Sequence, residues 1–166
     1  MRSVLFAVSA LVIACATTDV ALAQPAKTPA DRGFNFGGAT EFDSPALAKN
    51  DEEKRALAVL DEMSQGRWYL NVTTREGRLL RQLVEAVGAK RVVEIGTSSG
   101  YSTIWLALGV RSTGGKLFTH EIDPEIAKLA RANFQKAGGD DLITIIECYD
   151  HETVRQHTEP IYLVFL

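Results

Sequence analysis

The chain has 166 residues, of which 46% are hydrophobic and 23% charged, and its formal net charge is −3 at pH 7. These values are typical of one soluble globular domain. A slightly acidic chain offers no basic surface to a phosphate backbone, so nucleic acid is not an expected partner.

The first 23 residues have the pattern of a secretory signal peptide. Arg2 precedes an uncharged apolar run, residues 3–16, which is shorter than the roughly 20 residues that span a bilayer. Ala21-Leu22-Ala23 then provides small residues for cleavage before Gln24. We therefore expect an exported protein, periplasmic or secreted, with no transmembrane span.

A second interpretation of the same segment is open. Val12-Ile13-Ala14-Cys15 resembles a bacterial lipobox, which would make Cys15 a lipidated N-terminus. Cleavage after Ala23 would instead leave Cys148 as the single thiol, so no internal disulfide could form.

Residues 24–45 are rich in proline and glycine and are expected to be a linker, and residues 46–166 to be the folded domain. A helix is predicted to begin near Asn50, with acidic residues in its first turn. Thr73 and Glu76 form a capping box for the next helix. The predicted core positions of that helix are Leu79, Leu80, Leu83, Val84 and Val87.

Strand and helix patterns then alternate, which is typical of a parallel α/β sheet. The predicted strands are residues 91–95, 116–122, 142–147 and 161–166, and the predicted helices between them include 101–110 and 124–137. The last strand is wholly apolar, as in strands buried on both faces of a sheet. It would expose a hydrophobic edge unless a helix or a partner chain covers it.

The most informative motif lies between the first of these strands and the helix after it. Glu94-Ile95-Gly96-Thr97-Ser98-Ser99-Gly100 has serine where a dinucleotide loop has its middle glycine. The Glu94 carboxylate would repel a pyrophosphate but could pair with a cationic amino group. The pattern therefore favours an S-adenosylmethionine (SAM) loop, and a glycine-rich turn without a ligand is the alternative.

Glu121 ends the second strand of the series, 21 positions after Gly100. An acidic residue about 20 positions beyond such a loop is placed to accept hydrogen bonds from a ribose diol. Asp123-Pro124 supplies an N-cap and a first-turn proline for the following helix.

The histidines do not indicate a site. His120, His151 and His157 lack metal-ligand spacing, and His120 should point to the opposite face of its strand from Glu121. They are expected to be ordinary polar residues.

With these motifs in place, residues 71–166 resemble the cation-dependent O-methyltransferases of the catechol and caffeoyl-CoA type, in the class I SAM-dependent superfamily. The matching segments are Asn71-Val72, Glu76-Gly77, the string from Glu94 to Ser102, Thr119 to Pro124, and Val164-Phe165-Leu166. The resemblance implies a Rossmann-like sheet with about four of its seven strands present, and SAM as the cofactor. It also implies that the N-terminal helices cover the cofactor, although a plain packing role would fit their spacing equally well.

Site roles follow from the resemblance position by position. The methionine side of SAM would meet Glu94, Gly96, Thr97 and Ser98, with Gly100 completing the loop. The SAM carboxylate would meet Ser102 and the Val72 backbone, the ribose would meet Glu121, and the adenine would lie along Cys148 to Asp150. The adenine turn departs from the small pair that is usual in the family, because it reads Glu147-Cys148-Tyr149-Asp150.

In the family an aspartate that binds the metal follows the Val-Phe-Leu strand, and a lysine base and further metal ligands come after it. All of these would fall beyond Leu166, so we expect a C-terminally truncated chain without catalytic or metal residues of its own. The complete enzyme would use a divalent, Mg-type cation to lower the pKa of a catechol-like hydroxyl. That oxyanion would attack the SAM methyl group in line.

Three hypotheses follow. The chain is a fragment of an exported O-methyltransferase with a small-molecule acceptor, and it is a possible homodimer. Alternatively, it is a non-catalytic SAM- or nucleoside-binding module, or a degenerate exported domain without a ligand.

Overall fold

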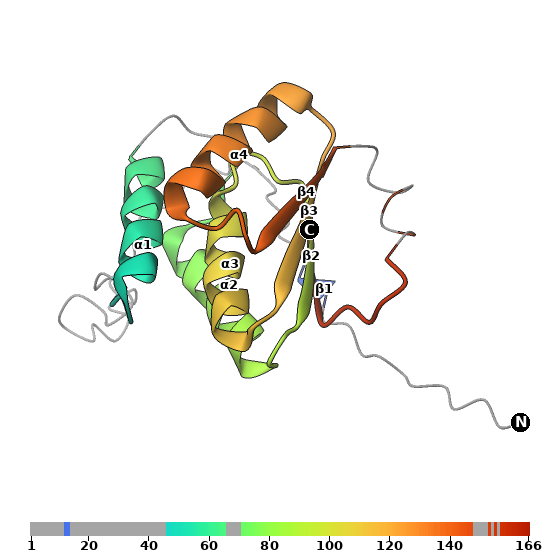
Figure 1. Ribbon diagram of the computed structural model, residues 1–166, viewed down its shortest axis with the longest axis horizontal. Helices are drawn as coiled ribbons and strands as arrows, with labels where there is room; N and C mark the ends of the chain where they lie inside the picture. The colour runs from blue at the N-terminus through green and yellow to red at the C-terminus, as the bar shows by residue number, and fades with distance from the viewer. Residues whose placement is uncertain (1–11, 14–45, 66–70, 148–152, 154, 156) are drawn as a thin grey trace, which may run out of the picture.

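A computed structural model describes residues 12–13, 46–65, 71–147, 153, 155 and 157–166 (Figure 1). The helices are α1 (Asp51–Ser64), α2 (Thr74–Ala86), α3 (Tyr101–Thr113) and α4 (Pro124–Ala137). The strands are β1 (Val12–Ile13), β2 (Arg91–Ile95), β3 (Lys116–Glu121), β4 (Ile143–Glu147) and β5 (Leu163–Phe165). The predicted α/β class and the order of its elements are confirmed.

The strands form one parallel sheet in the order β1-β5-β2-β3-β4. The crossovers through α3 and α4 move the chain from β2 to β4, and the labelled helices lie on one side of the sheet (Figure 1). Residues 157–162 lie on the other side of the sheet, and β5 pairs with β2 (Figure 1). This reversal makes a topological switch point at the carboxyl ends of β2 and β5, where ligands of open α/β sheets bind.

The predicted helix caps are present. The Thr73 hydroxyl accepts from the Glu76 N–H, and the Glu76 carboxylate accepts from the Thr73 N–H at 2.6 Å. Asp123 caps α4 by accepting from the Glu125 and Ile126 N–H groups. These local bonds explain why both helix starts could be predicted from the sequence.

Two predicted core positions of α2 are wrong. Leu79 and Val87 are each 51% exposed, whereas Leu80 and Val84 are buried. The buried residues of α2 follow helical spacing from Gly77, whose missing side chain lets the Trp105 indole of α3 pack against its backbone. A Cβ at Gly77 would lie 2.2 Å from the Trp105 ring, so the α2–α3 packing fixes which side of α2 is buried.

The edge beside β5 is also defined. The predicted strand 161–166 is confirmed, in a shorter form that begins at Leu163. Val12 and Ile13 pair in parallel with Val164 and Phe165, so β1 covers this edge rather than a helix. Apart from these two residues, the predicted signal peptide 1–23 and the linker 24–45 lie outside the described residues.

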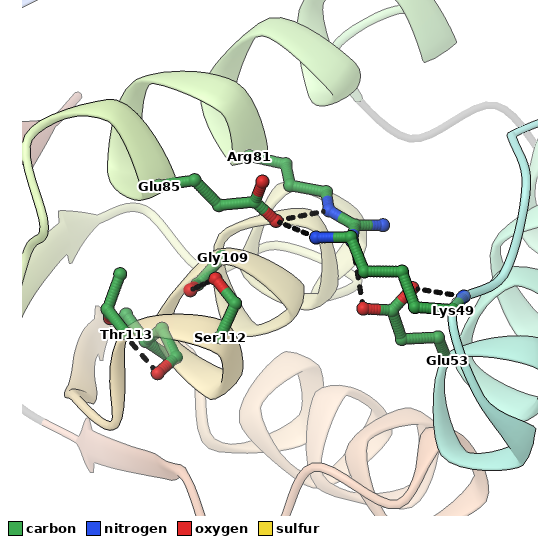
Figure 2. A network of polar contacts seen from close by, with 8 residues as sticks. Lys49, Glu53, Arg81, Glu85, Gly109, Ser112 and Thr113 are labelled. Atoms are coloured by element: carbon green, nitrogen blue, oxygen red, sulfur yellow. Dashed lines mark hydrogen bonds and ion pairs between the residues drawn. The ribbon is translucent and has the colours of Figure 1, made fainter.

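A charged network joins α1 to α2 (Figure 2). The Arg81 guanidinium donates to Glu53 and to Glu85, each at 2.8 Å, and Lys49 donates to Glu85 at 3.2 Å. Glu53 and Arg81 are both buried. Partial burial acts to raise the pKa of Glu85, but the hydrogen bonds and charges of Arg81 and Lys49 outweigh it and lower that pKa.

We predict that Arg81→Leu lowers the free energy of unfolding by about 3–5 kcal/mol, because it leaves the buried Glu53 carboxylate without its charged partner. Lys49→Ala, at an exposed pair, should cost less than about 1 kcal/mol. Urea denaturation at pH 7 measures both. The double variant Glu53→Leu with Arg81→Leu should be more stable than Arg81→Leu alone, and equal stabilities would contradict this account.

Candidate functional site

The loop between β2 and α3 has an alternating backbone conformation. Gly96, Ser98 and Gly100 have φ values of 91°, 50° and 87°, and Ser98 is the one non-glycine residue with positive φ in the described part of the chain. Glycine adopts this region at little cost, whereas serine does so less readily. Gly96 is exposed, and no atom lies within 4 Å of a Cβ built on it. The loop therefore presents backbone to open space, as a ligand-binding loop does.

The loop is fastened to the end of β3. The carbonyl oxygen of His120 accepts from the N–H groups of Gly96 and Thr97 at 3.0 and 3.1 Å. The Ser98 N–H donates to the Glu121 carboxylate at 2.8 Å. The structure thus brings the glycine loop and the predicted ribose acceptor together at the carboxyl ends of β2 and β3, next to the switch point.

Glu121 has three backbone donors. Besides Ser98, the N–H groups of Ile122 and Asp123 donate to its Oε1 atom at 3.0 and 3.1 Å. A carboxylate has about four acceptor positions. Roughly one remains, on Oε2, so one ribose hydroxyl can bind there and the second must share an oxygen with a backbone N–H.

Glu94 is fully buried beneath the loop. The hydroxyls of Ser102, Thr103 and Thr119 donate to its carboxylate at 2.6, 2.5 and 2.7 Å. Because Thr119 gives its single proton to Glu94, Thr97 must donate to Thr119 across their 2.7 Å contact. Burial raises the pKa of Glu94, and the three hydroxyl bonds oppose that rise without cancelling it.

The remaining predicted residues lie around the start of α3. Gly100 is its N-cap and provides no side-chain cap, and Ser102 lies in the first turn. A Cβ at Gly100 would also lie 2.4 Å from the Phe134 ring of α4. Val72 is half-buried and packs against the buried apolar residues beneath α2 and α3. The backbone N–H groups at a helix start without a side-chain cap can bind an anionic group such as a carboxylate.

Several supporting residues were missed from the sequence. Thr103 and Thr119 hold Glu94, and Ser99 donates to Asn71 at 2.9 Å. The Asn133 amide donates to the Ser99 carbonyl, also at 2.9 Å, so α4 supports the loop as well. Strand alternation could have indicated Thr119, because it shares a face of β3 with Glu121. The Ser99–Asn71 and Asn133–Ser99 contacts join residues 28 and 34 positions apart, which local patterns do not indicate.

Two predictions cannot be placed. Cys148 and Asp150, on the predicted adenine turn, lie outside the described residues.

Within the described ranges, no group of three or more His, Cys, Asp or Glu side chains could hold a metal ion. None of the helices in the described part of the chain has both the length and the apolar composition needed to cross a membrane.

A cavity of about 300 Å³ adjoins the start of α3. Its walls combine apolar and aromatic side chains with a few polar groups from α1 and α2: Ala46, Leu57, Leu60, Asp61, Ser64, Thr74, Arg78, Tyr101 and Trp105. The Thr74 and Tyr101 hydroxyls are hydrogen-bonded at 3.1 Å at this point. The cavity lies between N-terminal helices and the loop-bearing helix, and is large enough for a small molecule.

Taken together, the site offers a carboxylate next to exposed loop backbone, a helix start without a side-chain cap, and a buried second carboxylate. This set suits a ligand with a diol and an amino-acid end.

This chain is similar to known proteins. A family model described as "O-methyltransferase" matches residues 48–162. A catechol O-methyltransferase of Mycobacterium tuberculosis is 40% identical over 104 residues, which is 63% of this chain and 43% of that protein. One from Niastella koreensis is 35% identical over 88 residues, 52% of this chain and 39% of that protein. The chain thus spans about two fifths of the length of these relatives.

Solved structures agree with this match. The O-methyltransferase of Bacillus cereus, in complex with SAH, has a TM-score of 0.57 and 31% identity, over 72% of this chain and 55% of that one. TomG of Streptomyces achromogenes, in complex with SAM, has a TM-score of 0.58 and 28% identity, over 75% of this chain and 56% of that one. With the family model covering more than half of its residues, the chain belongs to the O-methyltransferase family and has the class I methyltransferase fold.

Proposed function

We propose that this chain binds SAM as the cofactor-binding part of an O-methyltransferase that methylates a hydroxyl of a small, catechol-like acceptor. The observation that carries the proposal is the junction next to the switch point, where the Ser98 N–H donates to Glu121. The SAM and SAH complexes of similar structures support the cofactor, and the names of the relatives support the acceptor.

Each part of the site has a role in this proposal. Glu121 accepts a ribose hydroxyl, and the exposed backbone of Gly96 allows the ligand to approach closely. The backbone N–H groups at the α3 start, including that of Ser102, receive the carboxylate of the amino-acid end, because the Ser102 hydroxyl donates to Glu94. The Val72 backbone is the second partner implied by the resemblance. Thr97, Thr103 and Thr119 fix the buried Glu94 carboxylate beneath that end. The adenine role of Cys148 and Asp150 stays a prediction.

Bound SAM supplies an electrophilic methyl group to an acceptor hydroxyl oxygen. The described residues gather no metal-ligand set for the divalent cation expected from the family, which stays a prediction. The proposed part of this chain in the reaction is to bind and orient the cofactor. The second candidate is a non-catalytic SAM- or nucleoside-binding module that would use the same junction of the loop with Glu121. From the sequence we also propose export through the signal peptide, with anchoring at Cys15 as the alternative. A homodimer is a further proposal from the sequence.

We predict that SAM raises the melting temperature of the chain, and that Glu121→Gln weakens SAM binding by about tenfold to a hundredfold. Loss of a charged hydrogen bond costs about 1.5–3 kcal/mol, and each 1.4 kcal/mol is about tenfold. Glu125→Gln removes an equal charge at an exposed position of α4 and should bind as the parent does. Isothermal titration calorimetry measures the affinities. Equal affinities for the two variants would remove Glu121 from the site.

We predict that Glu94→Gln changes how stability depends on pH. Because the folded pKa of Glu94 is raised, its contribution is fully present below its ordinary value of 4.5 and is lost as pH rises through the folded pKa. The parent should therefore lose stability relative to Glu94→Gln as pH rises above about 4.5. Denaturation at pH 4.5, 6 and 7.5 measures the difference, and a difference that is constant with pH would contradict the prediction.

A further inference from the structure

A chain of polar side chains crosses the face of the sheet opposite the helices. Arg91 Nη2 lies 3.2 Å from His157 Nδ1, and His157 Nε2 lies 3.1 Å from His120 Nε2. His120 Nδ1 lies 2.8 Å from Thr153 Oγ1. His120 is fully buried in β3, whereas His157 and Thr153 belong to the segment that returns to β5. The contacts therefore join this segment to the middle of the sheet.

The direction of each hydrogen bond follows from Arg91. A guanidinium can only donate, so His157 Nδ1 must accept and carries no proton. His157 then has its proton on Nε2 and donates to His120 Nε2, which must also be unprotonated. His120 has its proton on Nδ1 and donates to Thr153. Both imidazoles are thus neutral, with opposite tautomers.

A proton added to either ring would place two N–H groups against each other. Protonated His157 would direct Nδ1–H at the Arg91 guanidinium, and protonated His120 would direct Nε2–H at the Nε2–H of His157. Partial burial and the charge of Arg91 lower the pKa of His157 below its ordinary value of 6.5, in agreement with this geometry.

The charged group that contacts His157 is the Arg91 guanidinium. Arg91 pairs with Glu159 at 2.6 Å and lies 4.0 Å from the centre of the Phe118 ring, which also contacts His157 edge-on. By strand register, β4 and β5 face the pair with Thr144, Ile146 and Val164, which do not titrate. Lys116 shares this face of β3, and Arg155 and Tyr162 lie in the described residues before β5. Strand alternation places the carboxylates of the neighbouring strands, Glu94, Glu121 and Glu147, on the opposite face.

His120 also links this chain to the cofactor loop. Its carbonyl oxygen accepts from the Gly96 and Thr97 N–H groups, while its side chain is fixed on the far face by His157. We propose that His120 and His157 are positioning residues for the cofactor loop, and that protonation of this imidazole pair at acid pH weakens SAM binding. The second half of this proposal rests on the proposed function.

The direction of the pH effect follows from the linkage between proton binding and stability. A histidine whose pKa is lowered in the ordered state contributes stability that is present above the ordinary pKa of 6.5 and is lost as pH falls through the lower value. Each unit of difference between the two states corresponds to a tenfold change in the equilibrium. Loss of this stability loosens His120, whose carbonyl oxygen holds the loop, so we expect SAM to bind less tightly at pH 5.5 than at pH 7.5.

The first experiment needs no ligand and no variant. Nitrogen NMR of the histidine rings in the whole chain at pH 7.5 should show His157 with its proton on Nε2 and His120 with its proton on Nδ1. Identical tautomers, or a charged ring in either residue, would overturn the hydrogen-bond chain.

The second experiment compares SAM affinity at pH 7.5 and 5.5 by calorimetry. The parent dissociation constant should rise more than about threefold at the lower pH, because protonation of His157 opposes its contact with Arg91. In His157→Gln the amide can still accept from Arg91 and donate to His120 but does not titrate, so the constant should change less than about twofold beyond any change shared with other groups. His157→Leu, which breaks the chain at both pH values, should bind more weakly at pH 7.5 and resemble the acidic parent.

The outcomes separate the two proposals. Equal pH dependence in the parent and His157→Gln would overturn the positioning role while leaving SAM binding intact. No SAM binding by the parent at either pH would overturn the proposed function, and the ring tautomers would still decide the hydrogen-bond chain.

Discussion

The candidate site depends on the hydrogen bonds that hold the β2–α3 loop against the end of β3. Three successive N–H groups of the loop, from Gly96 to Ser98, donate to the His120 carbonyl and the Glu121 carboxylate. These bonds hold the loop in a conformation with positive φ at Ser98, which costs on the order of 1–3 kcal/mol for a residue other than glycine. This conformation occurs where the neighbouring strands β2 and β3 end side by side. It places the exposed backbone of the loop next to the acidic acceptor Glu121.

Strand β3 organises two polar sets on its opposite faces. Thr119 faces the helices and donates to the buried Glu94, whereas His120 faces the other way and contacts His157. The two residues are adjacent in the strand, so their side chains point to opposite faces of the sheet at the same end of β3, next to the loop. The site therefore has support from both sides of the sheet, and changes at a residue on the far face can reach the loop through one backbone carbonyl.

The sequence was most informative where structure is determined locally. The capping box at Thr73, the Asp123 cap and the glycine loop each depend on residues a few positions apart, and the structure contains all three. The family match covers the loop and Glu121, and the structure brings them together. Gly77 belongs to the Glu76-Gly77 segment that matches the family. Its packing role could not be predicted, because it depends on the Trp105 ring of another helix.

The failures share one physical cause. Leu79 and Val87 were predicted to be buried because α2 is amphipathic, but the close approach of α3 at Gly77 selects a different stripe. No local spacing joins the histidines, and the contact of His157 with His120 therefore could not be predicted from the residue pattern. Contacts across 37 positions follow from strand order, which the residue pattern alone does not determine.

The central claim is that the junction of the glycine loop with Glu121 is a SAM site. Its most direct measurement is an amide NMR titration of the whole chain with S-adenosylhomocysteine, followed at every assigned residue. Saturable shifts that are largest at Gly96, Ser98, Ile122 and Asp123, whose N–H groups meet at the junction, are the result this account predicts. Saturable shifts that leave these amides unchanged, or no shifts at millimolar ligand, would contradict it.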